Sequence, residues 1–357
     1  MKIPVKQTLS PKPKPDQSNL GFGRHFTDHM FLMEYEKENG WINPRITPYA
    51  PLPLDPASMV LHYGQEVFEG LKAYRTSDGE LRLFRAIDNI RRFNSSNERL
   101  SIPFIDEGLF MDAINQLVLV DSGWVPELPD ASLYIRPFIF ATDPFLGVTS
   151  SDSFLFVIIL SPVGSYYSGG MSPTKLLVED EDVRAVRGGL GFAKTSANYA
   201  ATIRAQERAK SRGFTQILWL DALERKYIEE IGASNAFFVI DGTVVTPPLG
   251  GSILPGITRD SCIKLLRSWN VPVEERKISI DEIIAAQEND RLDEVFASGT
   301  AAVISPVGEL TYRDKTITIC NNAIGHISEK LYETLTGIQW GRLPDPFGWT
   351  TKVKSKK

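Results

Sequence analysis

The stretch Gly188-Gly189-Leu190-Gly191-Phe192-Ala193-Lys194-Thr195-Ser196-Ala197-Asn198-Tyr199 places one lysine in a glycine-rich loop. The residues from Thr195 to Arg212 are mostly helix formers, with hydroxyl residues at the start and Gly213 at the end, so they predict a helix. Lys194 therefore stands where a loop enters a helix. A lysine that loses solvation there can lower its pKa and condense with an aldehyde as a Schiff base. Most lysines are solvated surface charges, so this motif needs support from the rest of the chain.

The composition is that of an ordinary globular protein. The 357 residues are enough for two domains, and 42% of them are hydrophobic and 23% charged. The net charge of −5 comes from mixed signs without long runs of either. Neither nucleic acid nor an anionic membrane is therefore indicated as a partner.

The sequence carries no signal for export or for metal binding. The N-terminus leads into an arm rich in proline and lysine rather than the apolar core of a signal peptide. The longest apolar run, 154–160, is too short to cross a bilayer. Cys262 and Cys320 lack metal-ligand spacing and would stay reduced in a cytosol. We expect a cytoplasmic protein.

Strands and helices do not alternate strictly, which predicts a mixed α+β fold rather than a doubly wound parallel sheet. We expect a smaller N-terminal domain over residues 1–162, a linker over 163–173, whose turn-rich centre is 165–170, and a larger C-terminal domain over 174–357. The predicted strands are 81–84, 132–140, 154–160, 175–178, 216–220, 236–240 and 243–246; the predicted helices are 87–97, 195–212, 258–269 and one that begins at the capping box Ser279-x-x-Glu282.

Two segments of the second half suggest ligand-binding groups. Glu230 precedes a small-residue turn and an apolar strand, where a buried carboxylate could keep a heterocyclic nitrogen protonated; the alternative is an acid in a charged turn. Ile257 and Thr258 begin a helix, whose first amides can bind an anion; the alternative is simple N-capping by Thr258. A second small-residue turn, 297–302, offers more amides and the Thr300 hydroxyl.

The first half adds two arginines. Arg92 lies on a predicted helix and could bind phosphate or solvent. Tyr134 and Arg136 alternate along a predicted strand and therefore share one face. A hydroxyl beside a guanidinium suits a carboxylate ligand, and the alternative is the polar face of an edge strand.

In order and spacing these segments resemble the branched-chain amino-acid aminotransferases, a family of fold-type IV pyridoxal-phosphate enzymes. The resemblance runs from Phe26-Thr27-Asp28-His29-Met30 to Ile338-Gln339-Trp340-Gly341-Arg342 and includes the family-like stretch 62–73. It implies a two-domain α+β enzyme with the site between its domains, the C-terminal domain binding the cofactor pyridoxal 5'-phosphate. It also implies a homodimer.

The resemblance implies a role for each candidate residue. Lys194 would form the Schiff base and move the proton, Glu230 would pair with the pyridine nitrogen, and Tyr199 would bond the ring's phenolic oxygen. The phosphate would be bound by Arg92, the amides of Ile257 and Thr258 and the Thr300 hydroxyl. The substrate-binding residues would be Phe26, Tyr63, Phe68, Tyr134, Arg136, Val148, Thr300 and Ala301, with Val148 reaching the partner subunit's site.

The implied reaction is reversible amino transfer between L-leucine, L-isoleucine or L-valine and 2-oxoglutarate, which yields L-glutamate and branched-chain 2-oxo acids. Arg136 would bind the distal carboxylate of glutamate, whereas Phe26, Phe68 and the tyrosines would surround an aliphatic chain. Two departures stand out. Ala233 replaces a hydroxyl residue common in the family, and mammalian relatives carry redox cysteines where this chain has Ala302 and Ser305.

Two other functions remain open. One is another fold-type IV enzyme, either a D-amino-acid aminotransferase or aminodeoxychorismate lyase, since these share the lysine and the glutamate. The other is a protein that binds a phosphate ligand without turnover. The Tyr134-x-Arg136 pair and the stretch 62–72 favour the branched-chain enzymes over the first, and an intact Lys194 and Glu230 argue against the second.

Overall fold

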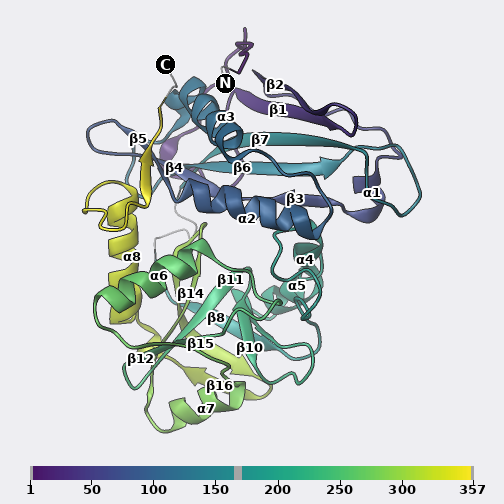
Figure 1. Ribbon diagram of the computed structural model, residues 1–357. Helices are drawn as coiled ribbons and strands as arrows, with labels where there is room; N and C mark the ends of the chain where they lie inside the picture. Colours follow the sequence, from purple (N-terminus) through teal and green to yellow (C-terminus); the bar gives the residue numbers. More distant parts are fainter. Residues whose placement is uncertain (1–2, 165–170, 355–357) are drawn as a thin grey trace. The chain divides into compact units, whose positions relative to one another are not determined.

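The computed structural model describes residues 3–164 and 171–354 (Figure 1). Contacts within the chain define two compact units. The first comprises Met1–Ser168, Ala193–Ser196 and Gly337–Lys357, and the second comprises Gly169–Phe192 and Ala197–Thr336. Two stretches predicted to belong to a C-terminal domain, 193–196 and 337–357, thus group with the first unit. The centre of the predicted linker, 165–170, lies outside the described residues.

The first unit is built on one sheet, which has eight strands among the described residues. Its strand order is β17-β5-β4-β6-β7-β1-β2, and β3 also pairs with β6. All of these pairings are antiparallel. The strands are β1 (His29–Glu36), β2 (Gly40–Pro48), β3 (Glu66–Phe68), β4 (Leu71–Arg75), β5 (Leu81–Phe84), β6 (Ser132–Ala141), β7 (Ser153–Val163) and β17 (Thr350–Lys352).

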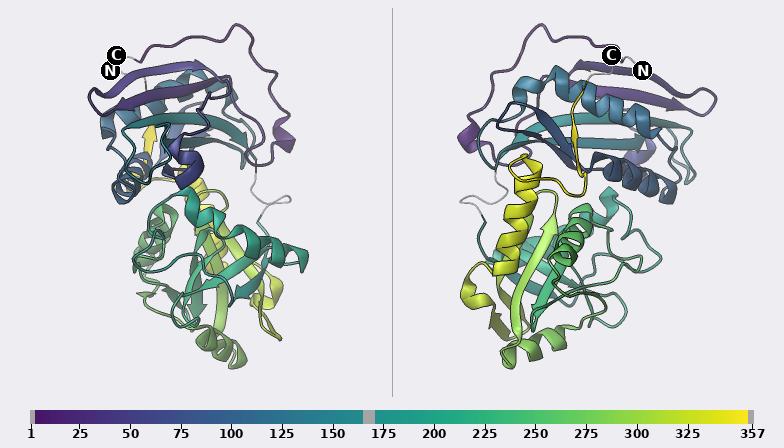
Figure 2. Two further views of the ribbon diagram at one scale, coloured as in Figure 1. Left: turned by 90° about the vertical axis from the view of Figure 1, so that its right-hand side faces the viewer. Right: turned by 60° about the vertical axis from the view of Figure 1, so that its left-hand side comes forward.

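Strand β6 shows how this sheet separates its core from its polar face. Leu133, Ile135 and Ile139 point to one side and are fully buried in the main hydrophobic cluster. The helices α2 (Ala86–Arg99) and α3 (Glu107–Val120) cover that side, as Figures 1 and 2 show. Tyr134 and Arg136 are on the opposite side. Because β6 lies between β4 and β7, the interpretation of this pair as part of an edge strand is wrong.

The second unit contains a nine-stranded sheet, again counting described residues. The order is β10-β9-β8-β15-β14-β11-β12-β13, with β16 beside β15, and a further pairing of β10 with β11 closes part of it into a barrel. The strands are β8 (Thr174–Glu179), β9 (Gln216–Leu220), β10 (Ile228–Ile231), β11 (Ser234–Ile240), β12 (Thr243–Thr246), β13 (Val273–Glu275), β14 (Leu292–Gly299), β15 (Val303–Tyr312) and β16 (Lys315–Thr318).

The remaining helices are short to moderate in length. They are α1 (Met59–Tyr63), α4 (Ser196–Ala200), α5 (Ile203–Ser211), α6 (Ile257–Ser268), α7 (Ile280–Glu288) and α8 (His326–Gln339), with 3-10 turns at Gln17–Asn19, Ser122–Trp124 and Cys320–Asn322. The predicted mixed α+β fold is confirmed. No helix in the described part of the chain is long and apolar enough to cross a membrane.

The prediction of one continuous helix over 195–212 is wrong. The stretch 195–212 forms two helices, α4 and α5, which are separated at residues 201 and 202. The Thr202 hydroxyl donates to the carbonyl oxygen of Tyr199 at 2.7 Å, and the Thr202 amide donates to the same oxygen at 3.0 Å. A threonine that bonds the preceding turn competes with the helical pattern and interrupts it. The predicted start of the helix at Ser279 is confirmed, since Ser279 is the N-cap of α7 and its Oγ accepts from the Glu282 amide at 3.1 Å, whereas the Glu282 carboxylate pairs with Arg276.

Candidate active site

Lys194 is held through its backbone by residues of the first unit. Its amide donates to Ser96 Oγ at 2.9 Å, and its carbonyl oxygen accepts from the Phe68 amide at 3.0 Å. The following Thr195 hydroxyl donates to the Glu66 carbonyl oxygen at 2.7 Å. The Lys194 amine lies 5.0 Å from the centre of the Phe68 ring. The loop thus presents a half-buried amine from a fixed backbone.

Arg92 and Glu69 form a buried ion pair in the same unit. Arg92 Nε donates to Glu69 Oε1 at 2.7 Å and Nη2 donates to Oε2 at 3.0 Å, with only 9% and 1% of the two side chains exposed. Arg92 is on α2, as expected, but its guanidinium is oriented by a carboxylate rather than by solvent. An arginine fixed in this way is suited to bind a phosphate.

Tyr134 and Arg136 form the pair that their alternation predicts. Arg136 Nη2 donates to the Tyr134 hydroxyl at 3.0 Å, and the guanidinium carbon lies 4.6 Å from the centre of the Phe68 ring. A Cβ at Gly70 would come within 1.9 Å of the Tyr134 hydroxyl oxygen, so the backbone approach there requires glycine. Phe68 therefore has both Lys194 and Arg136 beside its ring.

Three predicted substrate residues lie elsewhere in the first unit. Phe26 stacks on Tyr49, with ring centres 5.4 Å apart. Tyr63 is the last residue of α1, and its hydroxyl donates to the carbonyl oxygen of Leu146. Val148, two residues further on, is 86% exposed.

Glu230 in the second unit is a buried strand residue, not an acid in a charged turn. It is 2% exposed on β10, and its Oε1 accepts from the Leu254 amide at 2.8 Å. Arg184 Nε lies 3.3 Å from its Oε2. Asn235, on the adjacent β11, donates from Nδ2 to the Leu254 carbonyl oxygen at 2.9 Å. Leu254 thereby ties Glu230 to the loop that enters α6.

The start of α6 has the form of an anion site. Its N-cap is Gly256, which makes no side-chain capping bond, so the interpretation of Thr258 as the N-cap is wrong. Thr258 is instead inside the helix and 7% exposed. The positive end of the helix dipole at Ile257 and Thr258 favours a phosphate or carboxylate there.

The remaining predicted residues of the second unit are Thr300, Ala301 and Tyr199. The Thr300 and Ala301 turn follows β14, whose Ser298 is the register partner of Asn235, so the turn lies at the end of the sheet where Glu230 and Asn235 lie. Tyr199 is on α4, which is anchored where Asn198 Nδ2 donates to the Leu190 carbonyl oxygen at 2.8 Å.

Three buried charged residues near these groups have no predicted role. Glu69 orients Arg92, Arg184 contacts Glu230, and Lys72 is the register partner of Tyr134 with 5% of its surface exposed. Glu69 and Lys72 belong to the family-like stretch 62–73, whereas Arg184 stands apart from any motif. Only the structure shows what these charges face.

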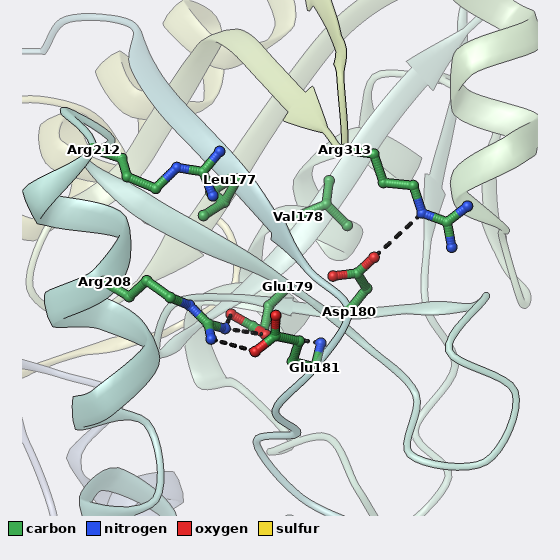
Figure 3. Close-up of a pocket in the computed structure, with 8 residues that line it drawn as sticks. All are labelled: Leu177, Val178, Glu179, Asp180, Glu181, Arg208, Arg212 and Arg313. Carbon is green, nitrogen blue, oxygen red and sulfur yellow. Dashed lines mark hydrogen bonds and ion pairs between the residues drawn. The ribbon is translucent and has the colours of Figure 1, made fainter.

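A surface cavity in the second unit, of about 110 Å³, is separate from the predicted residues (Figure 3). Arg208 donates to both Glu179 and Glu181 there, and Arg313 pairs with Asp180. The predicted site residues are not among those that line it, which are Leu177, Val178, Glu179, Asp180, Glu181, Arg208, Arg212 and Arg313. The cavity is a gap within a cluster of paired charges.

Known proteins match the chain over most of its length. The family described as amino-transferase class IV matches residues 66–310. Branched-chain-amino-acid aminotransferase 2 of Bacillus subtilis is 57% identical over 98% of this chain and 97% of its own length. The crystal structure of Escherichia coli branched-chain amino acid aminotransferase is 27% identical, with a TM-score of 0.77 over 92% of this chain and 99% of that one.

A third match was solved with a ligand. The branched-chain amino acid aminotransferase of T.th., complexed with N-(5'-phosphopyridoxyl)-L-glutamate, is 27% identical, with a TM-score of 0.73 over 91% of this chain and 98% of that one. With a family match over more than half of the residues and a relative 57% identical over nearly all of them, the chain belongs to the class IV aminotransferases, which are pyridoxal-phosphate-dependent enzymes, and within them to the branched-chain amino-acid aminotransferase family.

Proposed function

We propose that the protein transfers the amino group reversibly between L-leucine, L-isoleucine or L-valine and 2-oxoglutarate. The observation that carries the proposal is the group around Phe68, where the Lys194 amine and the Arg136 guanidinium flank one aromatic ring. This arrangement supplies an amine for chemistry, a cation for the carboxylate of glutamate and an apolar surface for a branched chain. The names of the Bacillus and T.th. relatives support the two substrate classes.

The described residues fit pyridoxal 5'-phosphate by the chemistry of their donors. The aldehyde requires an amine, which Lys194 provides from a fixed loop. The ring nitrogen requires a buried anion, which Glu230 provides at 2% exposure. The phosphate requires a cation and amides, which Arg92 and the start of α6 provide. Tyr199 and Thr300 would add hydroxyl donors to the ring oxygen and the phosphate.

The chemistry is divided between the cofactor and the protein. When bound, pyridoxal phosphate supplies an electron sink for the electrons released at the substrate Cα. Lys194 holds the cofactor and then moves the proton away from Cα. Glu230 holds the proton on the ring nitrogen, because its buried carboxylate is stabilised by a cation beside it.

Substrate selection would rest on the first unit. Arg136, positioned by Tyr134, would pair with the distal carboxylate of glutamate, and the Phe68 ring would contact an aliphatic side chain instead. Phe26 and Tyr63 would extend this apolar wall, and Ala301 of the second unit would add a backbone amide beside Thr300. A wall of this kind separates side chains that differ by one methylene by only about 1–3 kcal/mol, so all three branched amino acids should be accepted.

Assembly and location complete the proposal. We propose a cytoplasmic homodimer in which the exposed Val148 reaches the partner subunit's site. The support is the 86% exposure of Val148 and the tie between its loop and Tyr63. Equilibrium sedimentation tests the dimer: a monomer with full activity would contradict it.

The deciding experiment is a panel of L- and D-amino acids with 2-oxoglutarate as acceptor. Activity confined to L-leucine, L-isoleucine, L-valine and L-glutamate supports the proposal. Activity with D-amino acids, or release of pyruvate from aminodeoxychorismate, would assign one of the other fold-type IV reactions. A purified protein that stays colourless with pyridoxal phosphate and shows no borohydride-reducible linkage would point to a non-catalytic binder.

A further inference from the structure

Arg184 is a buried arginine that contacts three segments of the second unit. It is 7% exposed, and its Nε lies 3.3 Å from Glu230 Oε2. Its Nη2 donates to the carbonyl oxygen of Ser252 and, at 3.4 Å, to that of Gly191. Gly191 belongs to the glycine-rich loop before Lys194, and Ser252 belongs to the loop before α6. One guanidinium therefore connects the carboxylate to both loops.

The two loops meet where Arg184 binds them. A Cβ at Gly191 would come within 2.1 Å of the Ser252 carbonyl oxygen, so no side chain fits at that position. Two carbonyl oxygens are thus brought to the same place, and the planar arginine fork is well shaped to bind both. A lysine at position 184 could supply the charge but not this geometry.

A second carboxylate, that of Glu229, lies in the same region. Glu229 is 8% exposed, Ser252 Oγ donates to its Oε1, and its buried Oε2 has no hydrogen-bond partner among the described residues. Burial raises the pKa of Glu229, and the charge of Glu230 adds to this rise while Arg184 opposes it. Arg184 therefore interacts electrostatically with two buried acids, Glu229 and Glu230, and it contacts Glu230 directly.

We propose that Arg184 is a positioning residue for Glu230: it keeps that carboxylate charged and aimed at the cofactor's ring nitrogen. The inference rests on the proposed function, in which Glu230 serves the ring nitrogen. Without the cation, the buried Glu230 carboxylate would take up a proton itself, because an unpaired buried charge is strongly disfavoured. The ring nitrogen would then lose its proton.

The test uses the holoenzyme of R184Q and R184K, with R204Q as the matched control, since Arg204 is an exposed arginine paired with Asp182. The absorbance of the bound cofactor changes with pH, and the midpoint of this change reports whether the ring nitrogen is protonated. The reason is that a protonated ring withdraws electrons from the carbon that Lys194 binds. In R184Q the midpoint should rise by about one unit, and kcat for leucine should fall about tenfold or more, with KM changing little.

R184K should keep the midpoint of the wild type, because it keeps the charge, but lose part of kcat. R204Q should match the wild type in both measurements. An unchanged midpoint and kcat in R184Q would overturn the inference. If E230Q also turned over normally, the proposed role of Glu230 itself would fail; a slow E230Q beside a normal R184Q would remove only the role of Arg184.

A double variant keeps the test decisive if R184Q does not fold. On the E230Q background Arg184 no longer has a charge to hold, so E230Q/R184Q should be no slower than E230Q. A further loss of kcat in the double variant, multiplying that of E230Q, would show that Arg184 acts independently of Glu230 and would contradict the inference.

Discussion

The guanidinium of Arg92 and the carboxylate of Glu69 are joined by two hydrogen bonds, of 2.7 and 3.0 Å, in a buried part of the first unit. Asn89 Nδ2 and the Gly70 amide add donors to Glu69 Oε2 at 2.9 and 3.0 Å. Burial alone would raise the pKa of Glu69, but Arg92, Lys194 and Asn89 together hold that pKa below its ordinary value. Glu69 is therefore a fixed anion that orients the arginine.

E69Q should weaken the binding of pyridoxal phosphate by orienting Arg92 less firmly. The dissociation constant, measured by equilibrium dialysis, should increase about 10- to 100-fold, comparable to the loss when a group that orients a metal ligand is removed. E107Q is the control, since Glu107, on α3, pairs with the exposed Arg91, which lies next to Arg92 on α2. Equal cofactor affinities in E69Q and the wild type would show that Arg92 needs no orientation.

K194A should abolish transamination, because one amine both holds the cofactor and moves the proton. The variant should fold normally, since the contacts of Lys194 with Ser96 and Phe68 that fix this loop are made by its backbone. Turnover and a circular dichroism melt are the measurements, and K210A, which removes an exposed lysine of α5, is the control. Substantial turnover in K194A at normal cofactor occupancy would refute the assignment of Lys194.

E230Q should retain the cofactor and slow proton removal from Cα. The amide cannot balance a charged ring nitrogen, so kcat should fall by at least about a hundredfold, the loss expected when a main electrostatic contact of a transition state is removed. Single-turnover absorbance changes with L-leucine measure this step directly. A rate equal to that of the wild type would mean that another residue serves the ring nitrogen.

R136M should separate the two substrate classes. Arg136 Nε is buried without a hydrogen-bond partner among the described residues, so the guanidinium has a donor to offer to a substrate carboxylate. The variant keeps the bulk of the stem and should weaken glutamate and 2-oxoglutarate by about 2–4 kcal/mol. The leucine half-reaction, followed without acceptor, serves as the internal control. Equal losses in both halves would show a structural role or contact with the α-carboxylate.

Lys72 should make stability depend on pH in the alkaline range. Burial lowers its pKa from 10.5 to about 8, so between these values the unfolded chain binds a proton that the folded protein lacks. The free energy of unfolding should therefore rise from pH 8 to 10.5. K72M should be more stable than the wild type at pH 7 by about 3 kcal/mol, and this advantage should vanish above pH 10.5. Thermal melts of both proteins across this range measure the difference in stability. A difference that stays constant with pH would contradict the prediction.

Local patterns in the sequence predicted the fold well. Strands such as Leu81–Phe84 and Gln216–Leu220 have the predicted bounds, because each is a compact apolar run ended by turn residues. The alternation of Tyr134 and Arg136 correctly predicts their shared face. Its interior position in the sheet depends on the pairing with β4 (Leu71–Arg75), which is far away in the sequence, so the local pattern does not contain this information.

The site residues that were missed are those whose role depends on distant partners. Arg184 has no motif around it, and its importance comes from contact with Glu230, 46 positions later. The predicted end of the helix 195–212 is one residue beyond the end of α5 at Ser211, but the break at Thr202 depends on a hydroxyl that bonds a carbonyl oxygen of the preceding turn. Threonine is common enough inside helices that its presence alone does not predict a break.

The anchoring of Lys194 has a consequence for how the enzyme becomes active during synthesis. Ser96 and Glu66, which hold the lysine segment, precede it by 98 positions or more, and contacts this distant in sequence form late in folding. The peptide that carries the reactive amine is made long after the sheet that fixes it, and a fragment beginning at residue 174 would contain Lys194 without its anchors. Lys194 therefore reaches its anchored position only after the residues of the N-terminal half that hold it have been made.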